Sequence, residues 1–185
     1  KAFMDEYPNI NFVGECWTRP APAVAYWQTG VKNYNGFDSH LPSVMDFPVE
    51  EAIRQALETE GKQWGEGLTR VYDAIAMDYL YGNVNNILLM LGNHDMDRIA
   101  DVVKDQDPRR VKLANTLLAT MRGIPQVFYG DEYAMKSADR RMGHSTLRMP
   151  LPLGEAVTAE MQDMFDYQSR LFQWRKGEPV IHTGR

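Results

Sequence analysis

The sequence predicts an α/β fold of about four strand–helix units whose strands run parallel. Short apolar runs, typical of strands buried on both faces, alternate with segments whose apolar residues recur every three or four positions, as in helices. This alternation is typical of repeated βα units and a parallel sheet. The 185 residues, 44% of them hydrophobic, suffice for the core of one domain.

Four segments are expected to form the strands. INFVGEC at 10–16 is an apolar run that ends towards a loop, and LPSVMDF at 41–47 is a weaker candidate between prolines. NILLML at 86–91 is continuous in its apolar character and too short for a helix, and IPQVFYG follows at 124–130. Helices are expected at 1–7, 49–60, 68–80, 107–121 and 161–172, with a charged, glycine-rich loop at 131–152.

Four such units fit either an open doubly wound sheet or half of an eight-unit barrel, and the pattern alone does not choose between them. Glu15 falls at the end of the first predicted strand, and His94 and Asp95 fall just past the third. In a barrel the carboxyl ends of all strands share one rim, where catalytic groups lie. A barrel would therefore bring these residues to the same side.

The composition argues against several classes of partner. The formal net charge is −5 and no Lys or Arg cluster is longer than a pair, so a nucleic-acid partner is not expected. No apolar stretch approaches the ~20 residues of a membrane span, and the first residues lack the zones of a signal peptide. The single cysteine, Cys16, excludes an internal disulfide and a cysteine-cluster metal site, and the compartment stays open.

Four segments resemble, in order, sequences of the α-amylase family of glycoside hydrolases, in its neopullulanase and cyclomaltodextrinase branch. GECW around Glu15 is similar to the acid motif of the fifth barrel strand, and NHD at 93–95 to the motif after the seventh. GLTRVYDAIAMDYLYG at 67–82 and RGIPQVFYGDE at 122–132 resemble the helix before the seventh strand and the eighth strand. The resemblance implies that residues 1–185 are the C-terminal half of a catalytic TIM (β/α)8 barrel, without the upstream half or a C-terminal β domain.

The resemblance assigns roles to four residues near the expected rim. Glu15 would be the general acid and base, which must hold a proton near neutral pH, and partial burial beside Trp17 would favour this. Asp95 would orient sugar hydroxyls and stabilise the cationic transition state, with His94 donating to the same sugar and Asn93 positioning the loop. Taken alone, a glutamate in the position of Glu15 is more often an ordinary loop carboxylate or part of a structural ion pair. Asp95 could likewise be a helix cap and His94 a loop imidazole.

Other residues have more than one interpretation. Trp17 fits a sugar-stacking platform or core packing, and Arg148 resembles a substrate-contacting arginine, although His144 stands near a position that is often acidic in the family. Arg98, one helical turn past Asp95, is expected to pair structurally with that carboxylate or a neighbour. Gly123, Pro125 and Gly130 are expected to shape the last turn and strand.

The family's nucleophile motif, glycine-x-arginine-x-aspartate, does not occur in these residues. A retaining mechanism needs that carboxylate about 5 Å from the acid, so we expect a truncated and inactive fragment of a hydrolase that acts on α-glucan oligosaccharides. The alternative is a non-catalytic carbohydrate-binding or assembly half-barrel. Unpaired strand edges predict self-association in either case. The chemistry implies no cofactor, and calcium binding stays open because the family's ligands lie largely in the absent half.

Overall fold

The computed structural model describes residues 2–183, except for the side chains of residues 140–142. Lys1, where the first predicted helix begins, lies outside this part of the chain, as do residues 184–185. The described strands are β1 (Val13–Gly14), β2 (Ser43–Val44), β3 (Leu88–Met90) and β4 (Ile124–Gln126). Each lies inside the segment predicted for it but is shorter.

All four strands run parallel and follow one another in chain order. β1 pairs with β2, with Val13 opposite Ser43, and β3 pairs with β4, with Leu88 opposite Ile124. A parallel bridge between Met45 and Leu88 joins the two pairs. The predicted succession of parallel βα units is confirmed, and the carboxyl ends of the strands face one side.

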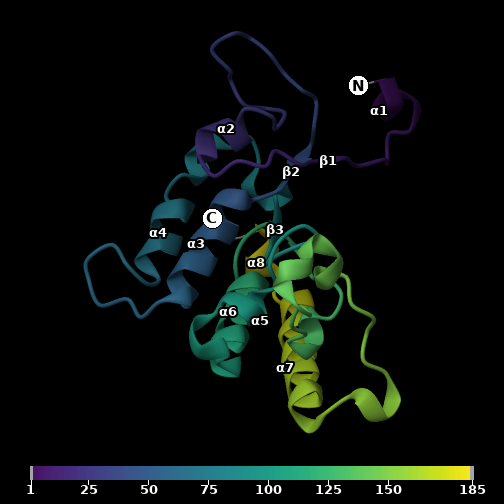
Figure 1. Ribbon diagram of the computed structural model, residues 1–185. Coiled ribbons are helices and arrows are strands. Elements are labelled where there is room, and N and C mark those ends of the chain that lie inside the picture. Colours follow the sequence, from purple (N-terminus) through teal and green to yellow (C-terminus); the bar gives the residue numbers. More distant parts are fainter. Residues whose placement is uncertain (1, 184–185) are drawn as a thin grey trace.

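Helices follow each strand and, together with short 3₁₀ turns, make up about half of the described residues (Figure 1). The α-helices are α1 (Ala2–Glu6), α2 (Ala21–Ala25), α3 (Phe47–Glu58), α4 (Thr69–Ile75), α5 (Ile99–Val102), α6 (Pro108–Thr120), α7 (Ala159–Gly177) and α8 (Pro179–Thr183). Short 3₁₀ turns lie at Asp78–Leu80, Val84–Asn86, Lys104–Gln106, Asp131–Tyr133, Arg140–Leu147 and Gly154–Ala156. Among residues 2–183, no helix combines the length and apolar character needed to cross a bilayer.

The three long helices begin where their sequences place a cap. Asp46, Asp107 and Thr158 each accept a hydrogen bond from a backbone N–H in the first turn of α3, α6 and α7 respectively. Pro108 occupies the first position of α6, where a missing N–H costs nothing. The predicted cap at Asp107 and Pro108 is confirmed.

The main core lies between β3 and helices α3 to α7. Its most buried members include Ile53, Leu89, Leu91, Leu118 and Met164, each 2% exposed or less. Helix α7 packs along α6, and α4 packs along α3 (Figure 1). Burying these apolar side chains is the main stabilisation of the fold and holds the strand ends in a fixed arrangement.

The structure departs from the prediction in three helical regions. The helix expected at 68–80 ends at Ile75 and gives way to the turn Asp78–Leu80, where the carboxylate of Asp78 accepts a hydrogen bond of 2.8 Å from Arg122 Nε. This ion pair ties the end of the segment to the start of β4 instead of continuing the helix. A short helix, α2, forms at Ala21–Ala25, where no helix was expected, and α8 was not predicted either.

The outer strands are not buried on both faces, which corrects the prediction. Val13 of β1 is 42% exposed and Ile124 of β4 is 39% exposed, because neither side chain belongs to the packed core of the described residues. Gly123, just before β4, was expected to be architectural. A Cβ there would lie 2.6 Å from the carbonyl oxygen of Ile87, and its φ is +89°, so only glycine fits.

Candidate functional site

The carboxyl ends of the parallel strands carry the predicted site residues. Glu15 follows β1 directly, and Asn93, His94 and Asp95 follow β3 after a short interval. Asp131 follows β4 in the same way. Because parallel strands end on the same side, these residues share one rim. We call residues 15–17 the Glu15 loop and residues 93–97 the Asp95 loop.

Three nitrogen-bearing side chains surround Asp95. Arg148 Nη2 donates to Oδ1 at 2.8 Å, His144 Nδ1 lies 3.3 Å from the same oxygen, and His94 Nε2 lies 3.3 Å from Oδ2. Desolvation favours protonation of Asp95, but the hydrogen bond with His144, the nearby His94 and the Arg148 pair together lower its pKa below the ordinary value. The carboxylate is therefore held in its charged form.

The backbone around Asp95 is fixed by its neighbours. Asn93 is 3% exposed, and its Oδ1 accepts a 2.9 Å hydrogen bond from the Asp95 N–H. Arg148 Nε reaches the carbonyl oxygen of His94 at 3.3 Å. Asp95 does not cap a helix, because α5 begins only at Ile99 and Arg98 occupies its cap position. The structure thus brings Asn93, His94, Asp95 and Arg148 together.

A buried arginine anchors the loop that delivers Arg148. The Arg98 side chain is fully buried, and its Nη1 donates to the carbonyl of Tyr129 at 2.9 Å and to Asp131 Oδ1 at 3.0 Å. Its Nη2 donates to the carbonyl of Leu147 at 2.9 Å, one residue before Arg148. Arg98 therefore pairs with Asp131 and not with Asp95. Burial raises the pKa of Asp131 to about 7, and the Arg98 guanidinium opposes that rise.

The Glu15 loop is much less constrained. Glu15 is exposed, and no described side chain forms a hydrogen bond or ion pair with it. It lines a hollow of about 470 Å³ together with Trp17, Trp27 and Leu41. The expected partial burial of Glu15 beside Trp17 is not present. The reason is that Trp17 turns to stack on Phe47, with ring centroids 5.2 Å apart, while it stays 54% exposed.

A separate pocket of about 180 Å³ lies between the two loops. Trp17 lines it from the Glu15 loop, and Met96 and Asp97 line it from the Asp95 loop. Glu50 of α3 also lines it and is 1% exposed, and burial raises its pKa to about 8 against the opposing charge of Arg54. Sequence reasoning missed Glu50, although its position three residues before Ile53 places it on the apolar face of the helix.

The described residues contain no group of three or more His, Cys, Asp or Glu side chains placed to hold a metal ion. The rim instead presents carboxylates, imidazoles, a guanidinium and an exposed indole. Such a set binds hydroxylated ligands by hydrogen bonds and stacking, and it can move protons.

The family model of the α-amylase catalytic domain matches residues 1–183. The chain is 34% identical over 142 residues to an α-amylase of Niallia circulans, covering 77% of this chain and 24% of that protein. It is 30% identical over 125 residues to a 4-α-glucanotransferase of Thermotoga neapolitana, covering 67% of this chain and 26% of that protein. The chain thus spans about a quarter of these relatives.

Solved structures agree on the fold. The cyclic α-maltosyl-(1→6)-maltose hydrolase of Arthrobacter globiformis superimposes with a TM-score of 0.78 at 20% identity, covering 100% of this chain and 37% of that one. The predicted partial TM barrel is confirmed, with the four parallel units forming part of a (β/α)8 barrel. On the match of the family model to nearly its whole length, the chain belongs to the α-amylase family.

Proposed function

We propose that this chain is the C-terminal half of a catalytic barrel in a retaining glycoside hydrolase that cleaves α-glucosidic bonds of starch-type oligosaccharides. The observation that carries the proposal is the contrast at the rim. Asp95 is held charged by three partners, while Glu15, at the end of β1 in the same set of parallel strands, is exposed and has no partner among the described residues. The family membership supports carrying the family's roles to these two positions.

Glu15 takes the role of general acid and base. It protonates the departing glycosidic oxygen and later removes a proton from water. To do so it must carry a proton before bond cleavage, which burial favours, and its side chain is exposed in this chain. A sugar bound over Trp17, or further protein covering the hollow, would exclude water from Glu15 and supply the missing burial.

Asp95 supports the reaction by charge. An ionised carboxylate near the sugar stabilises positive charge that develops at the anomeric carbon in the transition state. His94 is 55% exposed, and Arg148 is 49% exposed, so both can reach substrate hydroxyls while they hold Asp95. Asn93 fixes the loop by accepting a hydrogen bond from the Asp95 N–H.

The chain by itself lacks the nucleophile. No glycine-x-arginine-x-aspartate pattern occurs in its 185 residues, and double displacement requires a second carboxylate about 5 Å from the acid. We therefore expect the isolated chain to be inactive and the complete barrel to require a segment that supplies this aspartate. The neopullulanase and cyclomaltodextrinase branch remains our preferred placement, supported by GECW and by the likeness to the Arthrobacter hydrolase.

Restoring the barrel tests the function. The first barrel half of the Niallia circulans α-amylase is fused upstream of this chain, and hydrolysis of maltotriose is followed. Replacement of Glu15 by Gln is expected to lower kcat by about 10² to 10⁴, as for loss of a general acid. Glu58→Gln, at the exposed end of α3, is the matched control and should leave kcat unchanged. Unchanged turnover in Glu15→Gln would exclude the proposed role.

A non-catalytic half-barrel that binds carbohydrate is a second candidate, favoured by the missing nucleophile and by the half-exposed rings of Trp17 and Trp27 beside one hollow. Calorimetry with maltotriose separates the two. Tight binding by the isolated chain, together with no turnover in the fused barrel, favours the binding module. Turnover in the fused barrel favours the hydrolase.

A further inference from the structure

The pocket between the Glu15 loop and the Asp95 loop has no part in the chemistry described above. Its volume is about 180 Å³, and its walls include Trp17, Arg19, Glu50, Arg54 and Met96. It opens at Arg19, whose side chain is 76% exposed, and it closes at Glu50, whose side chain is 1% exposed. Concave sites with a few converging polar groups and a perturbed carboxyl group are typical of ligand binding.

We propose that this pocket binds one neutral pyranose ring of an α-glucan, a glucosyl unit separate from those that Glu15 and Asp95 engage, with Glu50 accepting a hydroxyl hydrogen bond at its floor. The inference rests on the proposed function and deepens it by naming where a longer substrate chain is held. Trp17 lines both this pocket and the hollow at Glu15, so one indole borders both sugar positions.

The charges of the pocket favour a neutral ligand. Arg19 lies 3.4 Å from a carboxylate oxygen of Glu51, and Arg54 Nε lies 3.4 Å from Glu50 Oε1, so two cations face two carboxyl groups. A phosphate would be repelled by the Glu51 carboxylate, and an ammonium ion would be repelled by the Arg19 and Arg54 guanidinium groups. A sugar offers hydroxyl donors and acceptors without net charge, and it can contact both kinds of group.

The pocket also has unused hydrogen-bonding capacity. Among the described residues, no group forms a hydrogen bond with Glu50 Oε1, because the approach of Arg54 Nε lacks hydrogen-bond geometry. Arg54 Nη1 instead donates to the carbonyl of Asp97 at 2.9 Å. A buried oxygen without a partner is costly, and a ligand hydroxyl would remove that cost. Since burial raises the pKa of Glu50 to about 8, its carboxyl is neutral at pH 7 and can both donate and accept.

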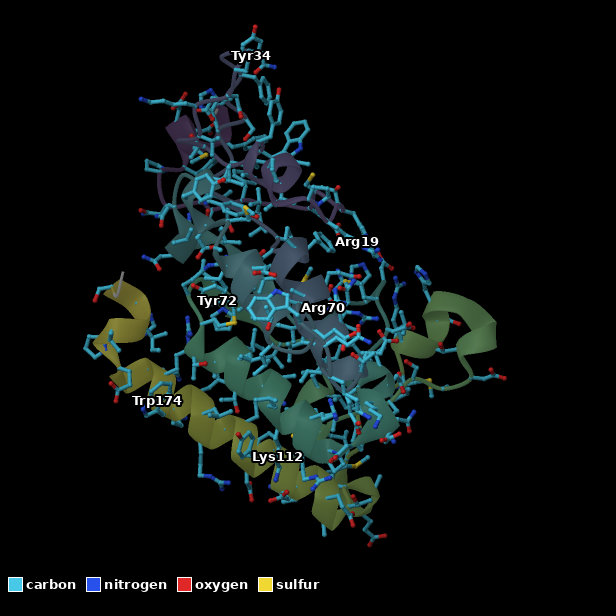
Figure 2. All side chains as sticks on the ribbon, turned by 90° about the vertical axis from the view of Figure 1, so that its left-hand side faces the viewer. Arg19, Tyr34, Arg70, Tyr72, Lys112 and Trp174 are labelled. Carbon is cyan, nitrogen blue, oxygen red and sulfur yellow. The ribbon has the colours of Figure 1, made fainter. Side chains whose placement is uncertain are left out.

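The aromatic wall fits the same ligand. Trp17 stacks on Phe47 at an interplanar angle of 24° and remains 54% exposed, so the indole is rigid and still accessible. A rigid aromatic ring offers an apolar surface to the C–H face of a pyranose at little entropic cost. Figure 2 shows Arg19 beside the body of the molecule and Tyr34 at its far tip, so the exposed aromatic ring of Tyr34 belongs to a different surface.

The test uses the Met96 methyl group, which lines this pocket, as a reporter in nuclear magnetic resonance of the chain. Titration with maltotriose should shift the Met96 signal, which is assigned with Met96→Leu. Replacement of Glu50 by Leu should weaken maltotriose binding in calorimetry by about fivefold, as for one lost hydrogen bond, whereas Glu58→Leu should leave it unchanged. An unmoved Met96 signal with unchanged affinity in Glu50→Leu would overturn the proposal.

Two further measurements keep the test decisive. If circular dichroism shows that Glu50→Leu is unfolded, Met96→Trp replaces it, because a larger ring fills the pocket without touching the carboxyl group. In the fused barrel, Glu50→Leu should raise KM for maltohexaose by about fivefold and leave KM for maltose unchanged. If Glu15→Gln loses turnover but Glu50→Leu changes neither KM, the proposed sugar site in the pocket is excluded and the proposed reaction stands. If Glu15→Gln keeps its turnover but maltotriose still shifts the Met96 signal, the proposed role of Glu15 is excluded and the sugar site in the pocket stands.

Discussion

The Asp95 loop and the Glu15 loop lie on one rim, but they differ in how many contacts within this chain hold their carboxylates in place. Around Asp95, three side chains contact the carboxylate, and Arg98 ties the supporting segments together with three hydrogen bonds. Glu15 is exposed and has no partner among the described residues. Contacts within this chain therefore fix the position of Asp95, the proposed charge-stabilising residue, but not that of Glu15, the proposed proton donor.

The difference follows from the positions of β3 and β1, the strands that precede the two loops, in the parallel sheet. β3 has a neighbour on both sides, through the Met45 bridge and the pairing with β4, so the segment after it is held by elements from two directions. β1 pairs on one side only in the described chain. A residue that follows an outer strand depends on whatever covers that edge, and this is why local sequence does not determine the environment of Glu15.

Removing the anchor of the Asp95 loop should produce the largest effect. Replacement of Arg98 by Met leaves the Asp131 carboxyl buried without its partner, and we expect a loss of about 3 to 5 kcal/mol in the free energy of unfolding. Urea denaturation measures it. Because Asp131 can then take up a proton, the loss should be smaller at pH 5 than at pH 8.

The control for this anchor is Arg109→Met. Arg109 pairs with Asp107 on the surface and is 88% exposed, so its loss should change the free energy of unfolding only slightly. If Arg98→Met is no more destabilising than Arg109→Met, Arg98 does not anchor the Asp95 loop, and this loop is not held more firmly than the Glu15 loop.

Glu50, which lies between the two loops, should give the next largest effect and a defined pH dependence. Its pKa is raised from 4.5 to about 8 in the folded state, so the folded protein binds this proton more tightly than the unfolded chain. The resulting stabilisation is complete below pH about 4 and is lost as the pH rises towards 8. Glu50→Gln should match the unmodified chain at pH 4 and exceed it at pH 8 by roughly 2 to 4 kcal/mol in the free energy of unfolding.

Thermal unfolding between pH 4 and pH 9 checks this expectation. Asp131, with a pKa raised to about 7, contributes a slope of the same sign, so the variant should retain a weaker decline. Glu58→Gln serves as the control because Glu58 lies exposed on the same helix. Parallel pH profiles for all three proteins would show that Glu50 is well solvated.

The exposed edge near Glu15 should promote association between copies of the chain. Val13 and Ile124 expose apolar side chains on the two outer strands, and unpaired edges accept another chain. Val13→Lys with Ile124→Lys should weaken self-association at least about tenfold in sedimentation velocity, since two charges would enter the contact. Leu153→Lys, at an exposed loop position, is the control. A monomeric unmodified chain at high concentration would contradict the prediction.

The sequence determined the fold more closely than it determined the site. Apolar periodicity located all four strands and the long helices, because each pattern reflects burial within this chain. It failed at 76–80, where the ion pair of Asp78 with Arg122, distant in sequence, ends the helix. It also did not identify Asp131 as the partner of Arg98, because nothing local to either residue records their contact.

The same distinction applies to the predicted site residues. Asn93, His94 and Asp95 are adjacent in the chain, so one motif located them together, and Arg148 meets them only through the fold. The expected burial of Glu15 was wrong because it depended on how Trp17 turns, and Trp17 turns to Phe47. Motifs thus predicted which residues lie at the rim, but not which of them have partners.

The smallest expected effect concerns the electrostatics of Asp95. His144 contributes a hydrogen bond that lowers the pKa of this carboxyl, so His144→Ala should raise it towards the ordinary value, as measured by carbon-detected titration. A group with a lowered pKa adds stability above its unfolded pKa and loses it as the pH falls through its folded pKa, so the small loss of stability in the variant should be present at pH 7 and disappear in acid. Arg148→Gln should raise the pKa in the same direction, and His40→Ala should not, because the His40 ring pairs with Asp38. If both rim variants leave the titration of Asp95 unchanged, its charge does not depend on these neighbours, and the Asp95 loop is no more determined by this chain than the Glu15 loop is.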